Sequence, residues 1–288
     1  MNQNEGEVVS SGPARRAVTS VRVCAVAGDT VRDRPDKVVT EEPMEIRLHG
    51  LGQEPEPLAV TMRTPGNDFE LAVGFCFTEG LLRAAAELDT VAYCLAGEGE
   101  QEYNVVTVKV RHAVDRSGHQ RAFIANASCG LCGKTTLDEV EQQCEPVGAG
   151  PVVARSLIGA LPERLRRAQT VFDATGGLHA AARFTADGEL VALREDVGRH
   201  NALDKLVGHA LLEGQLPLAD DVLLVSGRVS FEIVQKAAMA GVSIVCAVSA
   251  PSSLAIDAAR RFGQTLVGFV RDDSANVYTH PDRLDLEH

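Results

Sequence analysis

The chain of 288 residues has no tryptophan, few aromatic residues and no apolar run long enough to cross a membrane. It also lacks a basic excess, because 40 acidic residues outweigh 28 lysines and arginines to give a formal charge of −12. Nucleic acid and anionic membrane surfaces are therefore poor partners, and any anionic ligand needs a local cluster of arginines. The first residues lack the basic and apolar regions of a secretory signal, which predicts a cytoplasmic protein.

The seven cysteines do not indicate a disulfide framework, because their number is odd and a cytoplasmic protein keeps its thiols reduced. Five of them occur singly in apolar or helix-forming segments, where we expect inert thiols. These are Cys24, Cys76, Cys94, Cys144 and Cys246. The other two form the only closely spaced pair in the sequence.

That pair is Cys129 and Cys132, each followed by a glycine and both close to Lys134. An apolar run leads into this loop, and Thr136 with Glu139 forms a capping box that predicts a helix directly after it. A thiolate here gains about 0.3–1 kcal/mol from a helix N-terminus, and the thiolate is the reactive form of cysteine. The pair therefore predicts sulfur chemistry.

Other interpretations of the same loop remain open. Structural zinc needs four ligands and no second C-x-x-C occurs, but two copies of the chain could form a zinc-bridged scaffold with four cysteines. Gly133-Lys134-Thr135 matches the end of a P-loop, although Ser128 stands where the first glycine belongs. A P-loop-like nucleotide-binding protein is thus an alternative. A zinc deaminase is disfavoured, since no H-x-E occurs and no proline precedes Cys129.

The first half is predicted to be a smaller β-rich domain over residues 21–147, preceded by a flexible tail at 1–20. Apolar or alternating patterns predict strands at 21–27, 44–48, 58–62, 91–95 and 104–111. A helix is expected from Asp68 to about Leu82, capped by Asn67 with Glu70 reaching back. The domain ends with the cysteine loop and its following helix.

The second half, 148–288, is predicted to be an α/β cofactor-binding domain after a Pro- and Gly-rich boundary at 146–151, so that the whole chain is α/β (α+β overall). Helices are expected at 156–160 and 162–169, with Pro162 in a first turn, and a hairpin at 180–194. Helices at 201–213, 231–240 and 253–262 then alternate with strands at 221–225, 243–248 and 265–270. The apolar strands suggest a sheet covered on both faces.

Three turns in this half lead from strand ends into helices, at 196–201, 226–230 and 249–253. Each brings small or hydroxyl residues to a helix start, where unpaired N–H groups favour anions. Arg199 and Arg228 add guanidinium groups that can bind phosphate bidentately. The simpler alternative is that the serines only cap helices. We expect capping or hydrogen-bonding roles, rather than metal binding, for His179 and His200.

Read together, these segments resemble the formate dehydrogenase accessory sulfurtransferase (FdhD) family. The matching stretches span nearly the whole chain. They are 41–48 (EEPMEIRL), 62–68 (MRTPGND), 128–134 (SCGLCGK), 175–181 (TGGLHAA), 194–205 (REDVGRHNALDK), 226–232 (SGRVSFE) and 268–271 (GFVR).

The resemblance implies a sulfurtransferase that takes a persulfide from a cysteine desulfurase. It would pass this sulfur to the molybdenum of bis(molybdopterin guanine dinucleotide), which then enters formate dehydrogenase. It also implies a homodimer and a cytidine-deaminase-like layer sandwich in the second half. Cys129 would hold the persulfide, with Cys132 assisting. The cofactor, partly mimicked by a guanine nucleotide, would contact the three turns and one C-terminal segment. These residues are Arg199, His200, Ser226, Gly227, Arg228, Ser230, Ser249, Ser252, Phe269, Val270, Arg271, Asp272, Asp273 and Ser274.

Overall fold

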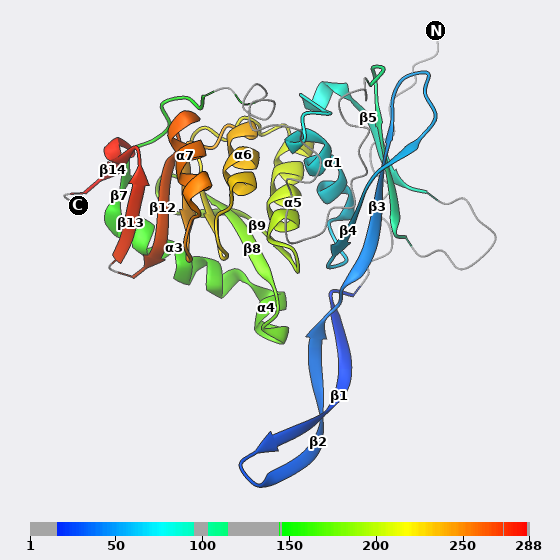
Figure 1. Ribbon diagram of the computed structural model, residues 1–288, viewed down its shortest axis with the longest axis vertical. Coiled ribbons are helices and arrows are strands. Elements are labelled where there is room, and N and C mark those ends of the chain that lie inside the picture. Colours follow the sequence, from blue (N-terminus) through cyan, green and yellow to red (C-terminus); the bar gives the residue numbers. More distant parts are fainter. Residues whose placement is uncertain (1–15, 95–102, 115–143, 145, 273, 287–288) are drawn as a thin grey trace.

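The computed structural model describes residues 16–94, 103–114, 144, 146–272 and 274–286. Its body contains a six-stranded and a four-stranded sheet with helices between them, and a long two-stranded hairpin projects away from this body (Figure 1). The predicted mixed α/β class is confirmed, whereas the deaminase-like layering stays a prediction. Within the described ranges, no helix has the length and apolarity needed to span a membrane.

The larger sheet has the strand order β13-β12-β11-β10-β8-β9. Its strands are β8 (His179–Phe184), β9 (Leu190–Asp196), β10 (Val222–Val225), β11 (Ile244–Ala247), β12 (Thr265–Arg271) and β13 (Ser274–Thr279). The central strands β10, β11 and β12 run parallel, while β8, β9 and β13 pair antiparallel with their neighbours. The predicted β8–β9 hairpin is confirmed, and its turn contains Gly188 at a φ of 78°.

Helices cover both faces of this sheet, as the apolar strands predict. They are α3 (Arg155–Ala168), α5 (Arg199–Leu212), α6 (Phe231–Met239) and α7 (Ser253–Arg261). All four residues of β10 are buried, and alternate residues face opposite sides of the sheet. Val222 and Leu224 belong to the apolar cluster with α3, and Leu223 and Val225 to the cluster with α5, α6 and α7. Period-two alternation between two buried faces accounts for the continuous apolar sequence.

Helix α3 differs from the two helices expected at 156–160 and 162–169. It is one helix with Pro162 in its interior. Proline at that position removes a backbone hydrogen bond and costs about 3 kcal/mol. Ile158, Leu161 and Leu165 lie on one face of the helix and are all buried against the sheet. Packing of this apolar face therefore outweighs the local signal of the proline.

The smaller sheet has the order β4-β3-β6-β5 and packs against helix α1 (Figure 1). Its elements are β3 (Glu42–His49), β4 (Glu56–Arg63), β5 (Leu88–Tyr93), β6 (Val105–Val110) and α1 (Asp68–Thr78). Val106, Val108 and Val110 are buried, as their alternation predicts. One apolar cluster runs from Met44 on β3 through α1 to Val234 on α6. The division into two domains at residue 147 stays a prediction.

Helices α1 and α5 are in tight contact at two glycines. A Cβ atom added to Gly74 would lie 1.9 Å from the carbonyl oxygen of Asp204. One added to Gly208 would lie 1.9 Å from the carbonyl oxygen of Glu70. Both neighbours are backbone atoms, which cannot rotate away as a side chain can. The two halves of the chain therefore meet through a contact that only glycine permits.

We expect Gly208→Ala to lower the free energy of unfolding by about 1–3 kcal/mol, because the added methyl group overpacks this crossing. Denaturant titration measures the loss. Gly148→Ala is the matched control, since a Cβ atom at Gly148 would meet nothing within 4 Å. Equal stability of the two variants would show that the helices separate without cost.

The start of α1 lies where the sequence predicts it, but the predicted cap is wrong. Asn67 adopts a left-handed conformation with a φ of 57°, and its side chain makes no capping hydrogen bond. Glu70 does not reach back to the helix start. It points instead to Arg194 on β9, with 2.7 Å between its Oε1 and Nη2 of Arg194. A long-range ion pair therefore replaces the local capping box.

The projecting hairpin consists of β1 (Val18–Ala27) and β2 (Thr30–Val39). Of these two strands the sequence predicts only the first, at 21–27; the β2 segment is rich in charge and contains Pro35. Pairing with β1 along its whole length makes this segment a strand without an apolar core. The short elements are η1 (Ala85–Glu87), β7 (Val153–Ala154), α4 (Thr170–Thr175), η2 (Pro281–Arg283) and β14 (Leu284–Asp285).

Candidate functional site at the carboxyl edge of the large sheet

A cavity of about 800 Å³ opens at the carboxyl ends of the parallel strands, between these ends, α3 and α4. Five residues that the sequence singles out contribute to its wall. They are Ser226 after β10, Val270 and Arg271 at the end of β12, Asp272 beyond it, and His179 at the start of β8. Ligands of open α/β sheets bind outside these strand ends. The second predicted turn, through Ser226, thus meets the predicted C-terminal segment at one hollow.

Gly176, Gly177, Leu178 and Val248 also line the cavity, and the rest of its wall comes from α3 and α4, whose lining residues no motif marks as functional. Leu165 and Phe172 supply apolar surface, and Arg166 lies over the Phe172 ring at 4.7 Å from its centroid. Gln169 is buried, and its Nε2 has no hydrogen-bond partner in the described part of the chain. An unpaired buried donor costs about 1–3 kcal/mol. An apolar wall with a few polar groups is typical of a ligand pocket.

Cationic groups gather beside this cavity. Burial lowers the pKa of His179, and the positive charges of Arg199, His200 and Arg228 lower it further against the opposing charge of Asp196. Arg199 Nε is buried without a hydrogen-bond partner among the described residues. In a chain of net charge −12, this local concentration of cations favours an anionic ligand at the sheet edge.

His200 contacts two polar side chains of α6 and its cap. Its Nε2 lies 3.2 Å from Oγ of Ser230 and 2.9 Å from Oε2 of Glu232. Burial raises the pKa of Glu232, but the hydrogen bond and charge of His200, together with the charges of Lys236 and Arg199, outweigh burial and hold it below its ordinary value. A hydrolase triad uses opposite ring nitrogens for its serine and carboxylate. Because both partners meet Nε2 here, His200 positions the turn rather than forming a triad.

The third turn joins the same edge. Ser252 caps α7 by accepting a hydrogen bond from the Ala255 N–H at 3.2 Å, which agrees with the simpler interpretation of that serine. The carbonyl of Ser249 accepts a bond from the Phe269 N–H at 3.2 Å, and Phe269 has a φ of 54°.

A bridge from Val229 to Pro251 connects this turn to the one that contains Arg228. The other members of the predicted site lie close by or outside the described residues. A Cβ atom at Gly227 would meet Nδ1 of His179 at 3.1 Å. Ser274 faces a separate hollow of about 240 Å³. Asp273 lies outside the described residues.

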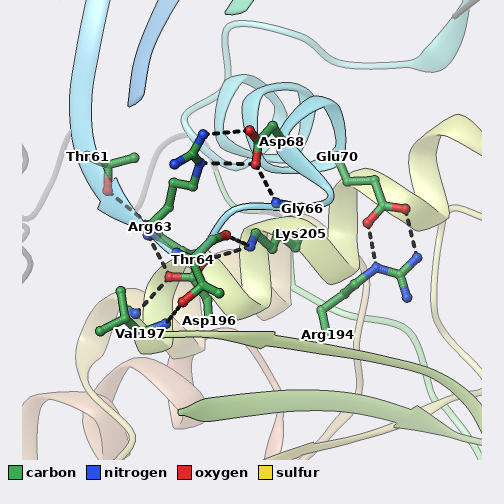
Figure 2. Close-up of polar contacts among 12 residues, drawn as sticks. Thr61, Arg63, Thr64, Gly66, Asp68, Glu70, Arg194, Asp196, Val197 and Lys205 are labelled. Carbon is green, nitrogen blue, oxygen red and sulfur yellow. Dashed lines mark hydrogen bonds and ion pairs between the residues drawn. The ribbon is translucent and has the colours of Figure 1, made fainter. Parts of the chain in front are cut away.

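A buried network fixes the first of the three turns (Figure 2). The carboxylate of Asp196 accepts hydrogen bonds from the N–H groups of Thr64 and Gly198 at 3.1 and 2.8 Å. It accepts two more from the side chains of Asn201 and Lys205, at 3.0 and 2.7 Å. Segments 62–68 and 194–205, far apart in the sequence, are thereby joined. The network positions the start of α5, which carries Arg199 and His200.

Two further buried ion pairs extend this junction. Arg63 is fully buried and donates to both carboxylate oxygens of Asp68 at the start of α1, at 3.1 and 2.8 Å. Lys236 on α6 donates to Asp204 of α5 at 2.9 Å and to Thr78 of α1 at 2.8 Å. Burial lowers the pKa of Lys236, but the carboxylates of Asp204 and Glu79 outweigh burial and raise it. Lys236 is therefore charged, and the junction is held by complete ion pairs.

The cysteine pair Cys129 and Cys132 lies outside the described residues, as do Lys134 and the P-loop-like Gly133-Lys134-Thr135. Of the cysteines predicted to be inert, Cys76, Cys144 and Cys246 are buried. Burial raises the pKa of the Cys246 thiol to about 12, which suppresses its thiolate. We expect Cys24 in an apolar segment, but it is exposed on the hairpin. No cluster of three metal-ligating side chains occurs in the described ranges.

Comparisons with known proteins agree on one family. The sequence profile of the FdhD/NarQ family matches residues 39–285. The sulfur carrier protein FdhD of Streptomyces coelicolor is 52% identical over 272 residues, which cover 92% of this chain and 95% of that protein. The sulfur carrier protein FdhD of Mycobacterium tuberculosis is 48% identical, with coverage of 91% and 97%.

The fold also has a solved counterpart. The crystal structure of a protein from Desulfotalea psychrophila, described as a formate dehydrogenase accessory protein, superposes with a TM-score of 0.73. The two sequences are 23% identical, and the match covers 93% of this chain and all of the other. At that identity the similarity establishes a shared fold.

Proposed function

Because this chain belongs to the FdhD/NarQ family, we propose that it is a sulfur carrier protein that supports formate dehydrogenase. Cys129 receives sulfur as a persulfide from a cysteine desulfurase, and the sulfur passes to the molybdenum cofactor bis(molybdopterin guanine dinucleotide). The cofactor is a substrate of this sulfurtransferase and is not retained. We place the reaction in the cytoplasm and assign the active form as a homodimer. The family membership carries this proposal.

The proposed loading step needs no outside oxidant or reductant. The Cys129 thiolate attacks the terminal sulfur of the donor's persulfide, a new S–S bond forms, and the old one breaks. Its electron pair leaves on the donor thiolate, so sulfur moves at constant oxidation level. Release of sulfide requires two electrons. Cys132 supplies them when its thiolate attacks the Cys129 sulfur, expels hydrosulfide and leaves a Cys129–Cys132 disulfide, which a cellular dithiol then reduces.

The carboxyl edge of the large sheet is the proposed site for the guanine nucleotide end of the cofactor. The cavity joins apolar surface from Leu165 and Phe172 to the cations Arg166 and Arg271, and Glu163 and Asp272 also line it. The turns beside it add Arg199 and Arg228. This combination suits a ligand with a flat base and a phosphate chain. The guanine preference comes from the family resemblance.

Arg228→Ala should weaken guanine nucleotide binding about ten- to a hundredfold, because one charge-assisted contact contributes roughly 1.5–3 kcal/mol. The variant should still load sulfur, because loading takes place on the cysteine loop. Calorimetry with GDP measures affinity, and the mass of the intact protein measures loading.

Arg260→Ala is the control for charge, since Arg260 is an exposed arginine near the end of α7 that is remote from the carboxyl edge. Equal GDP affinity of Arg228→Ala and the parent would contradict nucleotide binding at this edge. Loss of loading in a folded Arg228→Ala protein would contradict the separation of the two tasks.

A further inference from the structure

Among the described residues, no layer packs along the length of the β1–β2 hairpin. Each strand has ten residues, and the ribbon projects beyond α4 with only its base near the body (Figure 1). At that base, a Cβ atom on Gly177 would touch Val39 at 3.4 Å. Val26 and Val31 near the tip are 69% and 64% exposed. An isolated two-stranded hairpin is marginally stable in water, so pairing with a further strand would stabilise this ribbon.

The two outer edges of the ribbon differ in the way they resist pairing. Along β2, Pro35 lacks an N–H group, and five charged residues surround it. These are Arg32, Asp33, Arg34, Asp36 and Lys37. Along β1 the only charged residue is Arg22, and the strand has neither a proline nor a bulge. Charges and prolines are the usual means by which edge strands avoid pairing. In the part of the chain that the structure describes, the β1 edge is therefore open, and the β2 edge is protected.

We propose that the β1 edge pairs antiparallel with β1 of a second copy of this chain. The assembly is then a four-stranded sheet in the order β2-β1-β1-β2. A two-fold axis closes both open edges at once and leaves the protected β2 strands outermost, which ends the association at two copies. The inference rests on the homodimer proposed above and is independent of the sulfur chemistry.

The sequence of β1 selects the register of this pairing. In an antiparallel pair, opposite residues lie on the same face of the sheet, so the two-fold axis passes through a residue of β1 and not between two residues. Nearly complete overlap of the two ten-residue strands then places the axis at Arg22 or at Val23. Centring on Arg22 places two like charges opposite each other, which is unfavourable. Centring on Val23 places Val21 opposite Ala25 of the second copy and Val23 opposite itself. These residues form an apolar row across the two central strands.

Light scattering of the full chain over a concentration series tests the surface. We expect a dimer whose dissociation constant rises at least about tenfold in Val23→Lys, because two lysines then face each other across the axis. Val31→Lys is the control for an added charge on the hairpin: Val31 is exposed whereas Val23 is half-buried, and Val31 lies on the protected strand. Its dimer should dissociate as the parent's does.

A conservative variant gives an independent result. In the Cys24→Ser background, Val23→Cys should form a disulfide-linked dimer on mild oxidation, because opposite Cβ atoms lie about 4.5–5.5 Å apart. Val31→Cys should not. A monomeric parent would overturn the homodimer itself. A dimer that tolerates Val23→Lys, or that gives no cross-link at position 23, would overturn this interface and leave the β1 edge to a strand of another protein.

Discussion

Asp196→Ala should lower the free energy of unfolding by about 3–5 kcal/mol, the usual cost of removing one partner from a buried ion pair. Asp196 and Lys205 are 0% and 1% exposed. The substitution leaves the Lys205 ammonium with the Thr64 carbonyl, at 2.8 Å, as its partner in this network. It also removes the acceptor of the Thr64 and Gly198 N–H groups. Urea titration monitored by circular dichroism measures the loss.

Two further variants separate the buried charge from a general effect of substitution. Glu163→Ala removes the carboxylate of an exposed pair with Arg167 on α3 and should cost less than about 1 kcal/mol. The double variant Asp196→Ala/Lys205→Met should recover part of the stability, because no unpaired ammonium remains. A double variant less stable than Asp196→Ala alone would contradict this account of the junction.

Cys129→Ala should reduce formate dehydrogenase activity to the level of cells that lack the protein. The substitution removes the thiolate that accepts sulfur, and Cys76, Cys144 and Cys246 are buried. Cys246 is buried with a pKa of about 12, and Cys24 lies on the projecting hairpin. Complementation of a deletion strain measures the activity. Cys24→Ser is the control and should complement fully. Activity in the Cys129→Ala strain would show that the sulfur acceptor has been assigned wrongly.

The elements that the sequence predicts well are those whose own residues carry the signal. Alternating valines mark β6, and continuous apolar runs mark β10 and β11. The glycine turn before Glu189 marks the β8–β9 hairpin. The strand-end turns were also predictable as a group, because parallel strands bring their carboxyl ends to one edge. Local periodicity and topology were sufficient in each case.

The misassigned elements depend on partners distant in the chain. Glu70 reads locally as part of a capping box, yet Arg194, 124 positions away, determines its direction. Pro162 reads locally as a helix start, yet burial of the apolar face of α3 keeps the helix continuous. No strand is predicted for the β2 segment, because nothing in its charged sequence indicates that it pairs with β1.

Part of the candidate site was hidden for the same reason. Arg166, Gln169 and Phe172 form a wall of the cavity only because α3 and α4 fold across the strand ends. Their spacing in the sequence reflects the faces of those helices and not a ligand. Segments 62–68 and 194–205 both match motifs of the family. In the structure, Thr64, Asp196 and Lys205 of these segments bond to one another and hold the two halves together. Motif residues thus include structural as well as functional groups.

The most direct test of the central claim is the mass of the intact protein after incubation with a cysteine desulfurase and cysteine. The account predicts a gain of one sulfur atom that peptide mapping assigns to Cys129 and that a thiol reductant removes. Cys129→Ala should gain none, and Arg228→Ala should gain as much as the parent. An adduct on Cys24 or Cys132 in place of Cys129, or no adduct on the parent, would contradict the assignment of this chain as a persulfide carrier.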